Sequence, residues 1–193
     1  MKHIIKIGLF LFGSLLLSVQ AAPLTFSLDK MENDKKVVAT EKDWQGKYLL
    51  MAIGYTTCPD ICPTTLMDMK NALAEMDKIA PEKVKKIQPL FITIDPTTDK
   101  LKNITAYAGY FDPRIIGLRT DDFAKLDDVV AQLHGSYGYQ FEGKKVTPPN
   151  LPKGYTVMHS TFIYLYSPER MLVDAYPYNM DGKTLAGRII KNL

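Results

Sequence analysis

Two nearly continuous apolar runs, KYLLMAIGY at 47–55 and PLFITID at 89–95, constrain the fold more than any other feature of the sequence. A strand that is covered on both faces has this pattern, which is typical of parallel sheets. Parallel strands need a crossover between them, and apolar residues at helical spacing follow the first run as far as Pro81. The sequence therefore predicts two buried strands that are joined by a helix.

Turn and capping residues divide the rest of the chain into further strands and helices. The expected elements are a helix at 99–111, a short strand at 114–118, a helix that Asp121 or Asp122 caps and that ends near Gly135, strands within 161–176 and a helix at 182–192. This order predicts an α/β fold with a mixed central sheet and helices on both faces. In open sheets of this kind, ligands bind at the carboxyl ends of the parallel strands.

Residues 135–160 interrupt the pattern with glycines, prolines and tyrosines. A connection of this length in a compact domain is usually functional or mobile. We expect an irregular loop, of which the part from Gly135 to Met158 docks a partner through the aromatic side chains of Tyr137, Tyr139, Phe141 and Tyr155. The alternative is that these side chains pack the loop onto the domain.

The first residues have the composition of a secretory signal peptide. Lys2 and Lys6 precede an apolar run, and the small residues Val19 and Ala21 are spaced for cleavage. The run is shorter than the ~18 to 20 residues that cross a bilayer. We therefore expect a signal peptide at 1–21, a single domain at 22–193 and a periplasmic location. An uncleaved segment that anchors the protein in a membrane is the alternative.

Charge excludes one class of partner. The formal net charge is +3, and two of the lysines belong to the expected signal peptide. Without a basic surface we expect no nucleic-acid partner, and we expect membrane contact only through a partner or an uncleaved signal. Export would also place the cysteines in an oxidising compartment.

The segment GYTTCPDICPTT holds the only cysteines of the chain, Cys58 and Cys62. Each precedes a proline, which disfavours helical backbone angles at the residue before it. We therefore expect both thiols to lie ahead of the following helix, with Pro63 at its first position and Cys62 as its N-cap. The positive end of the helix dipole would then lower the pKa of the Cys62 thiol.

Three uses of the cysteine pair remain open. A structural disulfide would close only a short loop and so stabilise the fold little. A dithiol exchange catalyst usually has two residues between its cysteines, whereas three separate Cys58 from Cys62. A metal site is the third, since two sulfurs that share a metal lie farther apart than two bonded sulfurs.

A third metal ligand would have to come from elsewhere in the chain. Of the three histidines, His3 lies in the expected signal peptide and His134 at the end of a predicted helix. His159 comes just before a predicted buried strand, which the sheet could bring beside the cysteine loop. Two soft thiolates with one imidazole favour copper, whereas closed zinc sites normally need four protein ligands.

Three motifs of the chain resemble those of the Sco/SenC family, thioredoxin-like proteins that take part in copper delivery during cytochrome c oxidase assembly. The motifs are GYTTCPDICP at 54–63, TIDPTTD at 93–99 and HSTFIYL at 159–165. They occur in the order of the family and span most of the expected domain. The resemblance implies a three-layer thioredoxin-like fold.

The resemblance also implies roles for single residues. Cys58, Cys62 and His159 would be copper ligands, and the two cysteines would cycle as a redox pair between dithiol and disulfide. Asp95 matches an aspartate near the family's site and would be an outer partner of the metal ligands. A plain turn residue at the end of a strand is the alternative for Asp95.

The chain departs from the family pattern in two places. Many relatives have histidine where this chain has Thr57, so an additional ligand is absent there. Many relatives are also held in a membrane by an N-terminal helix, whereas the N-terminal segment of this chain is expected to be removed as a signal peptide. These departures leave two clients open, a cytochrome c oxidase subunit and another periplasmic copper protein, and they leave copper tolerance and redox signalling as alternative roles.

We expect a periplasmic copper-binding metallochaperone that delivers copper to, or prepares, the copper site of a partner. The alternative is a thiol-disulfide oxidoreductase that reduces the cysteines of a partner, and the two roles can coexist. In either case we expect no conventional enzyme beyond thiol-disulfide exchange. A peroxidase is disfavoured because the peroxidatic cysteine motif is missing.

Overall fold

The computed structural model describes residues 22–193, so the expected signal peptide at 1–21 lies outside the described residues. The central sheet has five strands in the order β10-β9-β3-β4-β5. Strands β3, β4 and β5 are parallel, whereas β9 is antiparallel to both of its neighbours. The bounds are β3 Tyr48–Gly54, β4 Ile87–Thr93, β5 Ile116–Leu118, β9 Phe162–Tyr166 and β10 Leu172–Pro177. The predicted mixed sheet is confirmed.

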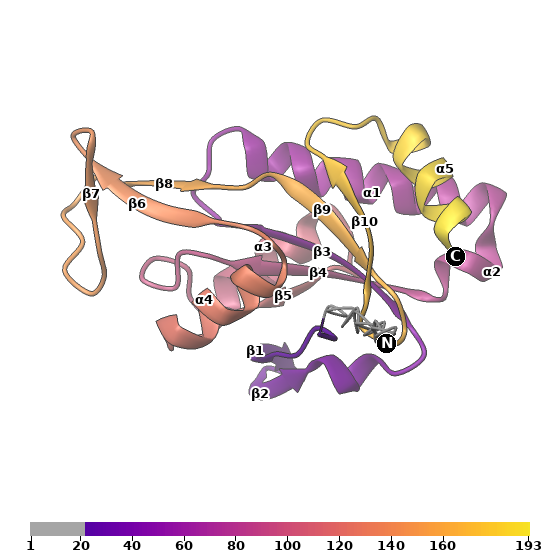
Figure 1. Ribbon diagram of the computed structural model, residues 1–193, viewed down its shortest axis with the longest axis horizontal. Helices are drawn as coiled ribbons and strands as arrows, with labels where there is room; N and C mark the ends of the chain where they lie inside the picture. Colours follow the sequence, from indigo (N-terminus) through magenta and orange to yellow (C-terminus); the bar gives the residue numbers. More distant parts are fainter. Residues whose placement is uncertain (1–21) are drawn as a thin grey trace, which may run out of the picture.

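Both faces of this sheet are covered, as the two apolar runs predict. In β3, Leu50 and Ala52 belong to one apolar cluster, while Leu49, Met51 and Ile53 belong to another on the opposite face. The first cluster contains side chains of α1 (Ile61–Ile79), α3 (Leu101–Phe111) and α5 (Gly182–Asn192), and the second those of α4 (Phe123–Gln132). In Figure 1, α1 and α5 lie above the sheet and α4 lies below it. A short helix, α2 (Pro81–Val84), follows α1.

An N-terminal hairpin covers part of the second face. Its strands are β1 (Ser27–Glu32) and β2 (Lys35–Thr40), and the short helix η1 (Glu41–Trp44) follows it. Backbone hydrogen bonds of 2.6 and 3.0 Å join Asp29 to Arg119, which follows β5. The apolar pattern of the sequence does not predict this hairpin, because charged residues occupy many of its positions.

The prediction of an irregular connection at 135–160 is wrong. The segment contains an antiparallel sheet in the order β7-β6-β8, with bounds β6 Tyr137–Phe141, β7 Lys144–Val146 and β8 Thr156–His159. Its glycines and prolines lie largely in the turns and the loop between short strands. In Figure 1 this sheet extends to the left of the central sheet. The hydroxyl of Tyr139 ties it to the domain with a 2.6 Å hydrogen bond to the Ile94 carbonyl.

An ion pair at the end of α3 gives the fold a pH dependence. Arg114 donates to both carboxylate oxygens of Asp112, at 2.9 and 2.6 Å. Burial would raise the pKa of the Asp112 carboxyl, but the hydrogen bonds from Arg114 outweigh it, so that the pKa lies below its ordinary value. A carboxyl with a lowered folded-state pKa stabilises the fold above its unfolded pKa of about 3.9, and this contribution disappears as the pH falls through the folded pKa.

Replacing Asp112 with asparagine is therefore expected to lower the free energy of unfolding by roughly 1 to 2 kcal/mol at pH 7. Urea unfolding of both proteins from pH 7 to pH 2 measures the difference. It should stay constant down to about pH 5 and shrink below about pH 4. If the difference in unfolding free energy between the two proteins persisted unchanged at the lowest pH, the charge of Asp112 would not be what stabilises the end of α3.

Candidate metal centre

The cysteine loop follows the carboxyl end of β3, as the sequence predicts. Helix α1, however, begins at Ile61, and its N-cap is Asp60. Cys58 lies ahead of the helix as expected, whereas Cys62 lies within the first turn, so the predicted N-cap position of Cys62 is wrong. Pro63 is tolerated there because the first N–H groups of a helix have no intrahelical partner.

Gly54, the last residue of β3, leaves room for the Cys62 sulfur. A methyl group in place of its hydrogen would lie 2.8 Å from Cys62 Sγ and 2.7 Å from a ring carbon of Phe91. The close approach buries Cys62, which is 1% exposed, while Cys58 is only half-buried. Both cysteines are free thiols. The two sulfurs therefore differ in their access to solvent.

His159 completes a cluster of three soft or borderline donors. It is the last residue of β8, and its Nε2 lies 3.5 Å from Cys62 Sγ. The sulfurs of Cys58 and Cys62 and a ring nitrogen of His159 all lie within 4.8 Å of one another. Two sulfurs that each bind one metal at about 2.3 Å can be up to about 4.6 Å apart. The donor set thus fits a single soft metal ion with little movement.

The ring of His159 is oriented for binding through Nε2. Its Nδ1 lies 2.8 Å from the Ser160 carbonyl, which can only accept, so Nδ1 carries the proton and donates it. The lone pair of Nε2 then faces the sulfurs. Burial lowers the pKa of the imidazole, and the hydrogen bond to Ser160 opposes this only in part. A neutral imidazole is the form that binds a metal.

The pKa values of the two thiols shift in opposite directions. Burial would raise the pKa of the Cys58 thiol, but N–H groups of Asp60 and Cys62, with further hydrogen bonds from the Cys62 thiol and Tyr55, lower it. Burial raises the pKa of the Cys62 thiol, and the neighbouring Cys58 adds to the rise. The expectation that the helix start lowers the pKa of Cys62 is therefore wrong, and Cys58 is the thiol that ionises first.

Alkylation measures this difference directly. With limiting iodoacetamide at pH 7, Cys58 is expected to react at least about ten times faster than Cys62, since each pKa unit changes the thiolate fraction about tenfold. Peptide mass spectrometry of the reduced, metal-free protein gives the two rates. Equal rates, or a faster Cys62, would contradict both the burial and the pKa order of the two sulfurs.

A buried carboxylate that the sequence did not single out holds the cysteine loop in place. Asp99 is fully buried and accepts hydrogen bonds from the Thr56 N–H at 3.0 Å, from the Thr56 hydroxyl and from the Thr93 hydroxyl at 2.6 Å. It thereby joins the loop before Cys58 to the end of β4. Asp99 lies in the motif TIDPTTD, but a lone aspartate ahead of a helix normally indicates a cap.

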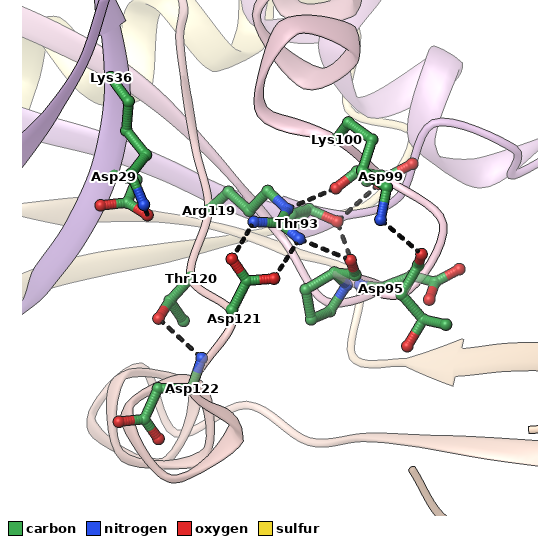
Figure 2. Close-up of polar contacts among 12 residues, drawn as sticks. Asp29, Lys36, Thr93, Asp95, Asp99, Lys100, Arg119, Thr120, Asp121 and Asp122 are labelled. Carbon is green, nitrogen blue, oxygen red and sulfur yellow. Dashed lines mark hydrogen bonds and ion pairs between the residues drawn. The ribbon is translucent and has the colours of Figure 1, made fainter. Parts of the chain in front are cut away.

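Arg119 holds the segment that carries Asp99 (Figure 2). Its guanidinium donates to the backbone carbonyl oxygens of Asp99 at 2.5 Å and of Pro96 at 2.8 Å. The carboxylate of Asp121 binds the other side of the guanidinium, at 2.5 and 2.8 Å. A buried arginine thus fixes the loop after β4, and through Asp99 the loop after β3.

Asp95 is buried beside the site without contacting the three donors. Both of its carboxylate oxygens accept from the hydroxyl of Tyr155, at 2.7 and 2.9 Å. Burial raises the pKa of the Asp95 carboxyl, and the hydrogen bond from Tyr155 opposes that rise. Because Tyr155 immediately precedes β8, this contact fixes the approach of the strand that carries His159.

Comparison with known proteins gives the family of the chain. A sequence profile described as SCO1/SenC matches residues 24–193, which is nearly all of the described part. The chain belongs to the SCO1/SenC family. The three motifs at 54–63, 93–99 and 159–165 all fall within the matched region.

Curated SCO1/SenC relatives resemble the chain over most of its length. It is 37% identical over 159 residues to the mitochondrial protein SCO1 of Saccharomyces cerevisiae, which covers 80% of this chain and 49% of that protein. It is 33% identical over 153 residues to protein sco1 of Schizosaccharomyces pombe, with 78% and 54% covered. The chain thus spans about half the length of these relatives.

Solved structures of SCO1/SenC proteins share the fold. The crystal structure of Arabidopsis thaliana ScoI with copper bound superposes with a TM-score of 0.73 at 29% identity, covering 88% of this chain and 96% of that one. Yeast Sco1 with copper bound gives 0.72 at 32% identity, covering 89% and 88%. The predicted thioredoxin-like fold is confirmed. Within residues 22–193, no helix is both long and apolar enough to span a bilayer.

Proposed function

We propose that this protein binds one copper ion through Cys58, Cys62 and His159 and delivers it to a copper-accepting protein. The convergence of two sulfurs and one ring nitrogen within 4.8 Å is the observation that carries the proposal. Thiolates are the soft ligands that Cu(I) prefers, and a neutral imidazole suits both oxidation states. The family membership and the copper-bound relatives support the choice of metal.

The number of donors favours copper over zinc. Structural zinc sites are closed by four protein ligands, whereas the cluster within residues 22–193 offers three. With both cysteines ionised and His159 neutral, the site has a net charge of −1 with Cu(I) and of zero with Cu(II). A three-donor site that opens to solvent beside Cys58 also leaves an approach for an accepting ligand.

We further propose that the protein acts in the periplasm after removal of residues 1–21, and that residues 22–193 form its single domain. Its client would be a subunit of cytochrome c oxidase or another exported copper protein. Support comes from the composition of the first residues and from the family's role in oxidase assembly. Asp95 would position His159 through Tyr155 rather than by touching the metal.

A titration tests the copper site. The reduced protein is mixed without oxygen with the Cu(I) complex of bicinchoninate, and the loss of the chelator's colour reports copper that moves to the protein. We expect one copper per chain, and transfer of that copper to a metal-free oxidase copper domain on mixing. Undiminished copper uptake by the Cys58→Ser, Cys62→Ser double variant would contradict the proposal.

A second function, thiol-disulfide exchange, is favoured by the unequal cysteines. The Cys58 thiolate would attack one sulfur of a client disulfide, forming a mixed disulfide and releasing one client thiolate. The Cys62 thiolate would then attack Cys58 Sγ, which forms the Cys58–Cys62 disulfide and releases the second client thiolate. Two electrons pass to the client. His159→Ala should retain this reduction while losing copper affinity, which separates the two functions in a stopped-flow assay.

A further inference from the structure

Strand β8 has one edge without a partner strand among the described residues. In the order β7-β6-β8 it pairs with β6 alone, with Met158 opposite Gly138 and His159 opposite Tyr137. In Figure 1, β6 runs below β8, whereas the loop between β3 and α1 crosses β8 and continues above it. Tyr55 of this loop contacts the Val157 carbonyl oxygen of β8. The open edge of β8 is thus the one that faces the cysteine loop.

The register shows which backbone groups point out of this edge. Ser160 N–H donates to the Ser136 carbonyl at 2.9 Å, which makes Ser136 and Ser160 a hydrogen-bonded pair. Hydrogen-bonded and non-bonded pairs alternate along an antiparallel ladder. Met158 therefore bonds to β6, whereas the N–H and C=O groups of Val157 and His159 point away from β6.

A side-chain contact agrees with this assignment. The hydroxyl of Tyr55, in the cysteine loop, lies 3.4 Å from the Val157 carbonyl oxygen. A pocket of about 280 Å³ lies along the edge, lined by Cys58, Pro59 and Ile61 on one side and by Val157, Met158 and His159 on the other. Among the described residues no backbone carbonyl accepts from the N–H groups of Val157 and His159.

We propose that this open edge docks an extended, cysteine-bearing segment of the copper-receiving protein, which adds beside β8 as a further strand. The inference rests on the proposed copper function and names the partner surface of that site. The outward N–H groups of Val157 and His159 and the His159 C=O are complementary to an extended backbone, which is the basis of recognition by strand addition. The Val157 C=O, which the Tyr55 hydroxyl contacts at 3.4 Å, would exchange that long contact for a backbone N–H of the added strand. The exposed thioether side chain of Met158 (55% exposed) offers apolar contact at the same edge.

The geometry of a sheet places such a segment against the metal ligands. Paired strands lie about 4.8 Å apart, and residues directly opposite each other project to the same face. The residue that pairs with His159 would therefore project its side chain beside the imidazole, toward Cys58 and Cys62. A cysteine at that position could take a copper ion from the site without further movement of the segment.

Amide exchange tests the docking on metal-free protein. The probe is a nine-residue peptide of alternating threonine and valine with a central cysteine, whose sulfur carries thionitrobenzoate as a mixed disulfide. In the Cys62→Ser variant, the Cys58 thiolate attacks the peptide sulfur and releases thionitrobenzoate. NMR of the ¹⁵N-labelled adduct is expected to show exchange about tenfold slower at Val157 and His159 than in the unlinked variant, with Thr156 and Met158 unchanged.

Two N-methylated forms of the peptide provide the matched controls. One form is methylated at the nitrogens two residues before and after the cysteine, and the other at the adjacent nitrogens. Only alternate N–H groups of a strand face a given neighbour, so one form should lose the protection and the other keep it. Equal protection with both forms, or none with the unmodified peptide, would overturn the proposal.

A second measurement tests the docking without the Cys62→Ser variant, in case that variant does not fold. The unmodified wild-type protein is titrated with the same peptide carrying serine in place of cysteine, and the amide shifts of β8 are followed. Shifts confined to Val157 and His159 support docking, and their absence at millimolar peptide overturns it. Copper titration of the same samples is independent of both results, so a protein that binds copper without protecting β8 refutes the docking alone.

Discussion

Replacing Cys58 or Cys62 with serine is expected to weaken Cu(I) binding by more than about 100-fold. Loss of an outer partner of a metal ligand already costs about 10- to 100-fold in affinity, and each thiolate is a direct donor in a cluster whose atoms lie within 4.8 Å of one another. Serine has nearly the same size but offers a hard hydroxyl that does not ionise near neutral pH. Competition with bicinchoninate measures the affinity.

The histidines offer a matched comparison for the third ligand. His159→Ala is expected to weaken Cu(I) binding at least about tenfold, since its Nε2 lies 3.5 Å from Cys62 Sγ. His134 lies at the carboxyl end of α4, where its N–H bonds to the Ala131 carbonyl. His134→Ala should therefore bind copper as the wild type does. Equal affinities of the two histidine variants would remove His159 from the site.

Replacing Asp99 with alanine is expected to lower the free energy of unfolding by roughly 2 to 4 kcal/mol. The carboxylate accepts from the Thr56 N–H and from the hydroxyls of Thr56 and Thr93. Each buried donor that is left without an acceptor costs about 1 to 3 kcal/mol. Because Thr56 lies two residues before Cys58, copper affinity should also fall. Guanidinium unfolding and copper competition on the same preparation measure both effects.

Asp121 provides a control in the same network. Its carboxylate pairs with the guanidinium of Arg119, but its side chain is 73% exposed. The Arg119 side chain is only 7% exposed, but it keeps its bonds to the carbonyl oxygens of Asp99 and Pro96 when Asp121 is removed. Asp121→Ala should therefore destabilise the fold less than Asp99→Ala, by roughly 1 to 2 kcal/mol, and leave copper binding unaltered. If Asp121→Ala proved as damaging as Asp99→Ala, the tether would depend on Arg119 rather than on the Asp99 carboxylate.

The central sheet could be predicted from the sequence because its two central strands are nearly continuous apolar runs. The runs at 47–55 and 89–95 are apolar at almost every position, and both become strands buried on both faces. The hairpin at 27–40 and the sheet within 137–159 lack that signal. Their strands are short and largely polar, and they are stabilised by contacts with parts of the chain that are distant in sequence, such as the bond from Tyr139 to Ile94.

The three candidate metal ligands could be predicted from the sequence, but the hydrogen bonds that hold the cysteine loop in place could not. Two lone cysteines and a late histidine stand out by residue type, and the structure brings Cys58, Cys62 and His159 together. The tether through Asp99 depends on side-chain contacts across 43 positions of sequence, which no local pattern encodes. The prediction of a lowered pKa for the Cys62 thiol was wrong, because the helix begins two residues earlier than the prolines suggested and Cys62 is buried.

The three donors belong to two different sheets. Cys58 and Cys62 follow β3 of the central sheet, whereas His159 ends β8 of the smaller one. An ion held by all three acts as a cross-link between these two parts, and binding that favours the folded state raises its stability by mass action. If the proposed copper site is correct, binding of the ion would stabilise the junction between the two sheets, and its release would remove that stabilisation.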